Sequence, residues 1–395
     1  MGFNNDRLQA IDAFLKSTYL EAGKLPCAVL QITQGGKTVH TSSQGFADVA
    51  QRKPITADSI FRIYSMTKPI ASVALMMLVE DGKLQLDDPV HKYIPAWKDL
   101  KVYAGGTLKT GWLTKPCARP MLVIDLLRHT AGLTYGFQLN TNVDAAYRRL
   151  GIGEIEKGEM TLAGMIDALA TLPLEFSPGE WWNYSVATDV VGWLVQTIAG
   201  VPFEDFLRTR IFQPCHMSDT GFHVRDGQEG RLATCYQPSK AGLVVQDQAE
   251  TSGFLKPPSF ISGGGGLVST AADYLKFCEA LRTGTPRLIG RKTLELMTAN
   301  HLPGDKSLPQ LSKSAFSEAA YDGVGFGLGF ATTMAVHKTM VAGNNGDYFW
   351  GGAASTFFFI DTAAEMVVTF MTQLIPSSTW PVRRQLRSMI YAAMD

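Results

Sequence analysis

The chain has 395 residues, which is more than one hydrophobic core usually supports and therefore predicts two lobes or two domains. Hydrophobic residues make up 46% and charged residues 18%, which excludes an intrinsically disordered chain. The 36 Lys and Arg residues balance the 36 Asp and Glu residues, so no net charge attracts the chain to nucleic acid or to an anionic membrane surface.

The N-terminal sequence and the cysteines bear on the cellular location. The first residues, MGFNNDRLQA, lack the basic start and apolar stretch of a secretory signal, and the longest strongly apolar stretch, residues 69–79, is too short to cross a bilayer. We therefore expect a cytoplasmic protein with neither a membrane nor a nucleic acid as its partner. The five cysteines are widely spaced, odd in number and free of any CxxC, which predicts free thiols rather than disulfides or a zinc site.

The first part of the chain predicts a helix followed by a β-hairpin. Residues 7–18 have a helical pattern, and two runs of strand character, 27–33 and 37–42, are joined at Gly35-Gly36. A glycine pair between two such runs is a hairpin signal. A third short run, residues 60–64, is predicted as a strand that leads directly into Ser65.

The middle of the chain is helical in character. Residues 70–79 are apolar on all sides, which predicts a buried helix, and Gly82 can cap its C-terminus. After the four glycines that follow Ser262, Thr270 and Asp273 predict a capping box for the next helix. Further helices, separated by Gly, Pro and Asn, are predicted at residues 121–128, 162–170, 186–198 and 203–212.

The last third of the chain returns to strands. Strands rich in Phe, Val and Thr are predicted at residues 325–333, 356–361 and 365–372, before a final helix at 382–393. Strands at both ends with helices between them predict one sheet built from the two termini. We expect an α/β domain from residues 1–84 and 256–395, a mainly helical domain from residues 85–255, and an active site between them.

Ser65 and Lys68 are the clearest candidates for catalysis. The sequence has no GxSxG, no HExxH and no metal-ligand spacing among its histidines, so no metal is expected. In Ser65-Met66-Thr67-Lys68, the SxxK spacing places a hydroxyl and an amine on one helical face, where the amine can take the serine proton. Because Pro69 cannot lie deep in a helix, Ser65 is expected near a helix N-terminus, whose N–H groups favour an oxyanion. An N-cap serine beside a surface lysine would give the same four residues.

Four segments together resemble the serine β-lactamases, the penicillin-binding proteins and the related family VIII carboxylesterases. Their order and spacing match, and the likeness covers most of the chain. The resemblance implies a β-lactamase/transpeptidase-like α/β (α+β) fold, an antiparallel sheet flanked by helices plus a helical lobe. The segments are residues 61–69 with the SxxK motif, residues 127–133 similar to HTSGL, residues 182–186 with their tyrosine, and residues 262–270 similar to SxGGLxST.

The resemblance also implies a role for each matching residue. Ser65 matches the nucleophile, Lys68 the partner that deprotonates or orients it, and Tyr184 the tyrosine that carries protons to and from the leaving group. A tyrosine can do this as a phenolate or near-phenolate with a cation nearby, and Lys68 is that cation. The family implies neither a metal nor an organic cofactor.

The third family motif is where this sequence departs. β-Lactamases and transpeptidases carry Lys or His, then Ser or Thr, then Gly, on a strand beside the serine, whereas this chain has Trp350-Gly351-Gly352-Ala353, which resembles the WGG of family VIII esterases. The cation that binds a substrate carboxylate is therefore missing, while the strand still offers the Ala353 N–H as an oxyanion donor beside that of Ser65. Val186 stands where the lactamase pattern has Asn. Both changes favour an uncharged ester.

The remaining candidate site residues say less about the function. Tyr135 matches an aromatic residue at the cleft of the family and is expected either to line the pocket or simply to pack; with Trp350, Gly351 and Gly352 it completes the expected substrate-binding set. His129 is expected to be a structural histidine rather than a base. Alternating glycines at positions 323, 325, 327 and 329 predict a strand face rather than a phosphate loop.

The sequence therefore predicts a carboxylesterase that cleaves short-chain esters of small molecules through a Ser65 acyl-enzyme, with β-lactam hydrolysis as no more than a weak side activity. One alternative keeps the mechanism: a class C-type β-lactamase, a D-peptidase or an acyltransferase. The other is a non-catalytic sensor of the penicillin-binding type, against which the intact set of Ser65, Lys68 and Tyr184 argues. No oligomeric state is indicated by the sequence.

Overall fold

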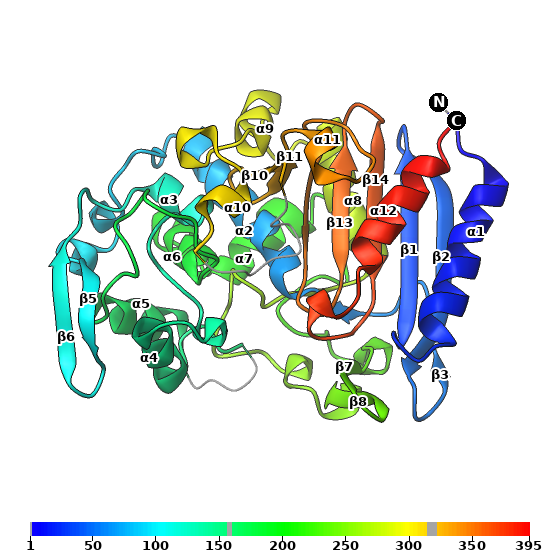
Figure 1. Ribbon diagram of the computed structural model, residues 1–395, viewed down its shortest axis with the longest axis horizontal. Helices are drawn as coiled ribbons and strands as arrows, with labels where there is room; N and C mark the ends of the chain where they lie inside the picture. The colour runs from blue at the N-terminus through cyan, green and yellow to red at the C-terminus, as the bar shows by residue number, and fades with distance from the viewer. Residues whose placement is uncertain (1, 156–159, 314–321) are drawn as a thin grey trace.

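An eight-stranded antiparallel sheet built from both ends of the chain forms the centre of the fold (Figure 1). The computed structural model describes residues 2–155, 160–313 and 322–395. The strand order is β10-β11-β12-β13-β14-β1-β2-β3, so the two ends of the chain meet where β14 pairs with β1, and the predicted fold class is confirmed. The strands are β1 (Cys27–Gln34), β2 (Lys37–Asp48), β3 (Lys53–Pro54), β10 (Val324–Phe326), β11 (Ala331–Thr333), β12 (Tyr348–Gly351), β13 (Phe357–Asp361) and β14 (Met366–Met371).

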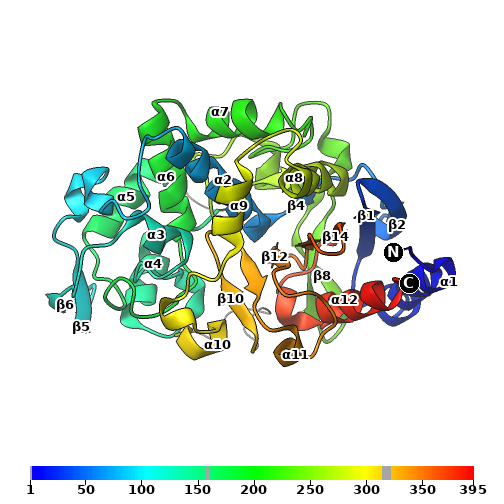
Figure 2. The same cartoon turned by 90° about the horizontal axis from the view of Figure 1, so that it is seen from above.

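Helices cover both faces of this sheet, because successive side chains of a strand point to opposite faces. On one face, α1 (Asn5–Leu15) and α12 (Val382–Ala392) share a hydrophobic cluster with Val368 of β14. On the other face, α8 (Ala271–Thr283) packs on β14, whose Val367 belongs to the main core. Figures 1 and 2 both place α1 and α12 together on the side of the sheet that is opposite α8. The helices predicted at both ends of the chain therefore act as one layer.

The second lobe is organised around α2 (Thr67–Glu80), which is buried along nearly its whole length. It packs against α6 (Ala187–Ala199), as expected for a helix that is apolar on all sides. One continuous hydrophobic core joins α2 to the sheet, so the domain boundaries at residues 84/85 and 255/256 stay a prediction. The other helices are α3 (Val123–Leu127), α4 (Asn142–Leu150), α5 (Leu162–Ala170), α7 (Phe203–Leu207), α9 (Arg291–Thr298), α10 (Leu308–Leu311) and α11 (Val336–Thr339).

Within the described residues, no single helix combines the length and the apolar composition needed to cross a membrane. One pair of helical segments, Ala187–Ala199 and Phe203–Phe212, meets that test only jointly, and the two segments are bent by 83°.

Three small two-stranded sheets add to the large one, and of their strands the sequence predicted only that at residues 61–62, within the run 60–64. Two of them are mostly exposed hairpins, whose side chains lack the alternation of apolar and polar residues that marks a half-buried strand. The sheets are β4 (Phe61–Arg62) with β9 (Val268–Ser269), β5 (Lys101–Thr107) with β6 (Gly111–Pro116), and β7 (Cys235–Ser239) with β8 (Gly242–Asp247).

The single strand predicted at residues 325–333 is wrong, because this segment folds back as the hairpin β10–β11. Gly329 in the connection has a φ of +95°, a conformation that favours glycine. A Cβ atom at Gly327 would lie only 2.0 Å from the carbonyl oxygen of Met297. These two glycines therefore allow a tight turn and a close approach to the backbone after α9, instead of lying on one strand face.

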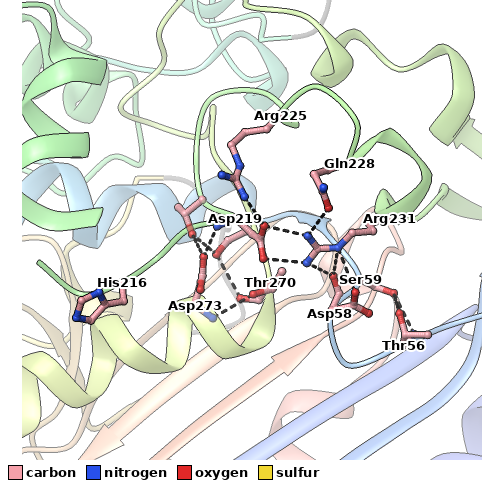
Figure 3. A network of polar contacts seen from close by, with 12 residues as sticks. Thr56, Asp58, Ser59, His216, Asp219, Arg225, Gln228, Arg231, Thr270 and Asp273 are labelled. Carbon is pink, nitrogen blue, oxygen red and sulfur yellow. Dashed lines mark hydrogen bonds and ion pairs between the residues drawn. The ribbon is translucent and has the colours of Figure 1, made fainter. Parts of the chain in front are cut away.

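A polar network fixes the start of α8 to the loop that contains Asp219 (Figure 3). Thr270 caps α8 by accepting a hydrogen bond from the Asp273 amide at 3.1 Å, which confirms half of the predicted capping box. The other half is wrong, because the Asp273 carboxylate accepts a hydrogen bond from the Asp219 amide at 2.7 Å instead. Asp219 in turn pairs with Arg225 and Arg231, at 3.1 and 2.9 Å. Tertiary contacts have here displaced a local capping contact.

We expect Arg62→Ala to destabilise the protein far more than Arg210→Ala. Arg62 is fully buried and donates hydrogen bonds to the Asp247 carboxylate at 2.5 Å and to the Ala233 carbonyl at 2.6 Å. Its loss leaves these acceptors without a cation, at a cost of about 3–5 kcal/mol. Arg210 forms an exposed ion pair with Asp81 at 3.3 Å, of the kind that contributes about 0–1 kcal/mol. Denaturant unfolding of both variants measures the difference, and equal losses would contradict this assignment.

Candidate active site

Ser65 lies in a short 3-10 turn, Tyr64–Met66, that runs directly into α2. The strand predicted at residues 60–64 is therefore wrong after Arg62, because the chain turns before it reaches the serine. Tyr64 has a φ of +41°, a strained backbone conformation for a bulky residue and one that recurs at functional sites. Ser65 is partly exposed although Tyr64 and Met66 on either side are buried. The turn thus presents one hydroxyl at the surface of a packed core.

Lys68 is held inside the core by three hydrogen bonds. It is 1% exposed and lies three residues after Ser65, at the start of α2. Its Nζ donates to the Ser65 Oγ at 3.5 Å, to the Tyr135 hydroxyl at 2.9 Å and to the Gly264 carbonyl at 2.7 Å. A long contact such as the first is common in catalytic pairs without substrate and shortens in the complex. The amine is therefore within reach of the serine proton.

Tyr184 meets Lys68 through its ring. It comes from the loop that leads into α6, is 1% exposed, and its ring centroid lies 4.4 Å from the Lys68 Nζ. Its hydroxyl accepts a hydrogen bond from the Trp350 Nε1 at 3.4 Å. The structure thus brings together Ser65, Lys68, Tyr184 and Trp350, with Lys68 as the shared neighbour of the serine and the tyrosine.

Tyr135 touches Lys68 more closely than the serine does. The sequence left open whether Tyr135 lines the pocket or simply packs, and the 2.9 Å contact with Lys68 places it within the polar centre of the site. Its ring lies 5.4 Å from that of Tyr184 and stacks on Phe137 at 4.7 Å. Burial, followed by the charges of Asp189 and Tyr184, raises the pKa of Tyr135 well above its usual value, so it stays a neutral phenol.

His129 packs against the ring of Tyr184. The two rings lie 5.0 Å apart, and the His129 Nδ1 is 3.2 Å from the Ser185 Oγ. Burial, and then the charge of Lys68, lowers the pKa of His129 well below its usual value, which keeps the ring neutral. This setting fits a structural histidine better than a general base.

The strand β12 places Trp350 and Gly351 on opposite faces of the sheet. Trp350 is 6% exposed and packs between Tyr184 and Phe326, at ring distances of 5.6 and 5.3 Å. A Cβ atom at Gly351 would lie 2.6 Å from the guanidinium of Arg383 on α12. Gly351 therefore leaves room for this arginine. Gly351 itself can contact a substrate only through its backbone atoms.

The end of β12 lies against the turn that carries Ser65. A Cβ atom at Gly352 would lie 2.3 Å from the carbonyl oxygen of Ile63. Ala353 lies in the turn after the strand rather than on the strand itself, which corrects the predicted position. Within residues 2–155, 160–313 and 322–395, the amides of Ser65 and Ala353 donate no hydrogen bond to another group. The oxyanion role of these two N–H groups stays a prediction.

The four glycines after Ser262 allow a close approach that larger residues would prevent. A Cβ atom at Gly263 would lie 2.5 Å from the carbonyl oxygen of Thr188, and one at Gly264 would lie 2.8 Å from the Tyr135 hydroxyl. The Gly264 carbonyl can therefore reach Lys68 from a segment that passes directly beside α6. The glycine-rich segment thus supplies a backbone acceptor for the Lys68 amine.

Asp189 is a residue of the site that the sequence analysis missed. It is buried in the first turn of α6, where its Oδ1 accepts hydrogen bonds from the Ser262 Oγ at 2.5 Å and from the Gly264 amide at 2.9 Å. Its signal in the sequence was the presence of one charged residue in an otherwise apolar and polar-uncharged helix, ATDVVGWLVQTIA. A buried carboxylate needs such partners.

Comparisons with known proteins find relatives along nearly the whole chain. The sequence model of the family described as Beta-lactamase matches residues 9–387. Protein Rv1367c of Mycobacterium tuberculosis is 34% identical over 362 residues, which cover 90% of this chain and 88% of that protein. Esterase EstB of Burkholderia gladioli is 29% identical over 399 residues, covering 94% and 92%. The solved structure of EstCE1, described as a hydrolase with promiscuous acyltransferase activity, matches with a TM-score of 0.81 at 27% identity and covers 98% of each chain.

Proposed function

Because this chain belongs to the β-lactamase family, we propose that it is a carboxylesterase of the family VIII type, which cleaves short-chain esters of small molecules through an acyl-enzyme on Ser65. The esterase relative and the hydrolase structure support the reaction class. The observation that carries the proposal is the place of Lys68, whose buried amine contacts both the Ser65 hydroxyl and the Tyr184 ring.

The first half-reaction forms the acyl-enzyme. The Ser65 Oγ attacks the ester carbonyl carbon while its proton passes to the Lys68–Tyr184 pair. The carbonyl oxygen becomes an oxyanion and accepts hydrogen bonds from the amides of Ser65 and Ala353, and each such donor contributes about 10²–10³ in rate. The bond to the alcohol oxygen then breaks, and Tyr184 returns the proton to that oxygen. The alcohol leaves and the acyl group remains on Ser65.

The second half-reaction repeats these roles with water. The Lys68–Tyr184 pair takes a proton from the water molecule, whose oxygen attacks the acyl carbon. The oxyanion forms again between the same two amides. When the bond to the Ser65 Oγ breaks, that oxygen regains a proton and the acid is released. Each proton is returned within the cycle, so the enzyme ends unchanged.

Trp350 directs the site toward neutral, small acyl groups. An indole offers an apolar face and one N–H where related lactamases have a cation, and here that N–H is directed to Tyr184. A substrate carboxylate, such as that of a β-lactam, loses a charge-assisted contact of about 1.5–3 kcal/mol. This loss corresponds to roughly a 10- to 150-fold handicap, which leaves lactam hydrolysis weak.

We expect Trp350→Ala to shift the preference toward longer acyl chains, because the indole occupies space beside Tyr184. The measurement is kcat/KM for p-nitrophenyl esters from C2 to C12 and for nitrocefin. Trp112→Ala, a tryptophan on the β5–β6 hairpin, serves as the matched control and should leave the profile unchanged. The proposal loses its basis if nitrocefin is cleaved as efficiently as the best ester, or if Trp350→Ala keeps the wild-type profile.

A second candidate is transfer of the acyl group to an alcohol. The buried positions of Lys68 and Tyr184, each 1% exposed, favour it because a site that limits access of water lets another acceptor compete. EstCE1 is described as having this side activity. Adding an alcohol during ester cleavage and quantifying the new ester against the free acid separates the two reactions.

The ester panel also tests the remaining alternatives. Efficient nitrocefin cleavage would favour a class C-type β-lactamase, and the absence of any alcohol release would favour a sensor of the penicillin-binding type. The cytoplasmic location and the lack of nucleic-acid and membrane partners stay predictions from the sequence.

A further inference from the structure

Asp189 is a buried carboxylate that the proposed mechanism does not yet use. Its side chain is 1% exposed, and it is the one charged residue in the thirteen-residue sequence of α6. Burying a carboxylate is costly unless it is hydrogen-bonded and near a positive charge. A packed apolar helix would be more stable with an apolar residue in this position, so the carboxylate needs an explanation.

One residue, Gly264, connects Asp189 to the Lys68 amine. The Asp189 Oδ1 accepts a hydrogen bond from the Gly264 amide at 2.9 Å, and the carbonyl of the same glycine accepts one from the Lys68 Nζ at 2.7 Å. The Ser262 hydroxyl holds the same Oδ1 at 2.5 Å. The carboxylate therefore fixes the glycine-rich segment in the position from which its carbonyl reaches Lys68.

The Asp189 carboxylate also acts on Lys68 through its charge. Within the described residues Lys68 forms no direct salt bridge, because its hydrogen bonds go to two hydroxyls and one carbonyl. Burial raises the pKa of Asp189, and the positive charge of Lys68 is the largest of the effects that oppose this rise. The attraction is reciprocal: a negative charge on Asp189 favours a positive charge on Lys68.

The other titratable groups at this position are phenols and an imidazole. Tyr135, from the loop before α4, contacts Lys68 directly, and the charge of Asp189 helps to raise its pKa. Tyr184, from the loop before α6, places its ring on Lys68, and His129 packs on Tyr184 as a neutral ring. Tyr135 and His129 stay neutral and add no negative charge to that of Asp189, whereas Tyr184 belongs to the pair that holds the proton.

We propose that Asp189 is a positioning residue that orients the Gly264 carbonyl toward Lys68 and supplies the counter-charge for the proton held by the Lys68–Tyr184 pair. This inference rests on the proposed function. The proton leaves the Ser65 Oγ, resides on the pair, and goes to the leaving alkoxide, while Asp189 keeps its charge throughout. Asp189 has no contact with the substrate and takes no proton.

The test is the pH dependence of kcat/KM and kcat for Asp189→Asn, which keeps the size of the side chain and removes its charge. Without that negative charge the site binds its proton less tightly, so the base is free at lower pH. The acid limb should move to lower pH by about one unit or more, the size of effect that a nearby charge has in a buried site. We also expect kcat to fall about tenfold or more at the plateau, with KM nearly unchanged.

Asp144→Asn is the matched control. Asp144 is also a buried carboxylate in a first helical turn, and it pairs with Arg148 at 2.6 Å on α4, outside the site. This variant should lose stability without moving the pH profile. A profile of Asp189→Asn that superposes on that of the wild type would overturn the proposal, since a merely structural role changes the amount of active enzyme and not its pH dependence.

The rate at which a fluorophosphonate labels Ser65, measured from pH 5 to 9, separates this inference from the proposed function. If the wild type hydrolyses esters and Asp189→Asn shows no shift in either profile, the function stands and the role of Asp189 is wrong. If the wild type neither cleaves an ester nor reacts with the probe, the function is wrong and the role of Asp189 is overturned with it.

Discussion

Replacing Ser65 by alanine is expected to lower ester turnover by at least about a thousandfold, because no acyl-enzyme can form without the hydroxyl. The structure places this hydroxyl in the 3-10 turn that leads into α2, 3.5 Å from the Lys68 amine and next to the strained backbone of Tyr64. Any rate that remains would come from the oxyanion donors acting on water. The measurement is steady-state hydrolysis of the best p-nitrophenyl ester, together with the pre-steady-state burst, which should disappear.

Ser72→Ala is the control for this variant. Ser72 is a buried serine on α2, seven residues after Ser65, and lies against Gly329. Its replacement should leave turnover within a few-fold of the wild-type value. A Ser65→Ala variant that retains a tenth of the wild-type rate with a normal burst would contradict the assignment of the nucleophile.

Lys68→Ala and Tyr184→Phe are each expected to lower kcat by at least about a hundredfold, the usual effect of losing a positioned acid or base. The two residues meet at 4.4 Å and serve one proton, so the double variant should lose far less than the product of the two effects. Tyr147→Phe, another buried tyrosine, on α4, is the control and should leave kcat nearly unchanged. Kinetics of all four variants on one ester make up the test, and losses that multiply would count against a shared proton path.

Much of the fold could be predicted because its longest elements have strong local patterns. The run at residues 70–79, which is apolar on every side of a helix, lies within the buried α2, and α5 has the predicted bounds. The glycine pair at residues 35 and 36 joins β1 to β2, as expected. The helix α4 was missed although Thr141 and Asp144 form a capping box at its start, because its polar sequence NVDAAYRRL hides the apolar face.

Errors in the predicted strands arose where tertiary contacts override local patterns. Residues 325–333 read as one strand, yet glycines at positions 327 and 329 turn the chain because α2 and the end of α9 leave no room for a side chain. Asp273 likewise bonds to the Asp219 amide rather than back to its own cap. Neither contact can be read from a window of neighbouring residues.

In the candidate site, too, residues in short motifs could be predicted and contacts between distant segments could not. Ser65, Lys68, Tyr184 and Trp350 were proposed from short motifs, and the structure brings these four together. Contacts between distant segments were not predictable: that of Lys68 with the Gly264 carbonyl spans 196 positions. Asp189 was missed for this reason, since its partners lie on the glycine-rich segment. That Gly351 faces Arg383 rather than the pocket also depends on how α12 packs on the sheet.

The identity of the nucleophile is the central claim, and covalent labelling tests it most directly. The intact protein would be inactivated with a fluorophosphonate, digested, and its modified peptide sequenced by mass spectrometry. We expect one label per chain, on Ser65, formed in parallel with the loss of ester hydrolysis and absent from Ser65→Ala. A label on another residue that accompanies the loss of activity, or full ester turnover by a protein that takes up no label, would contradict it.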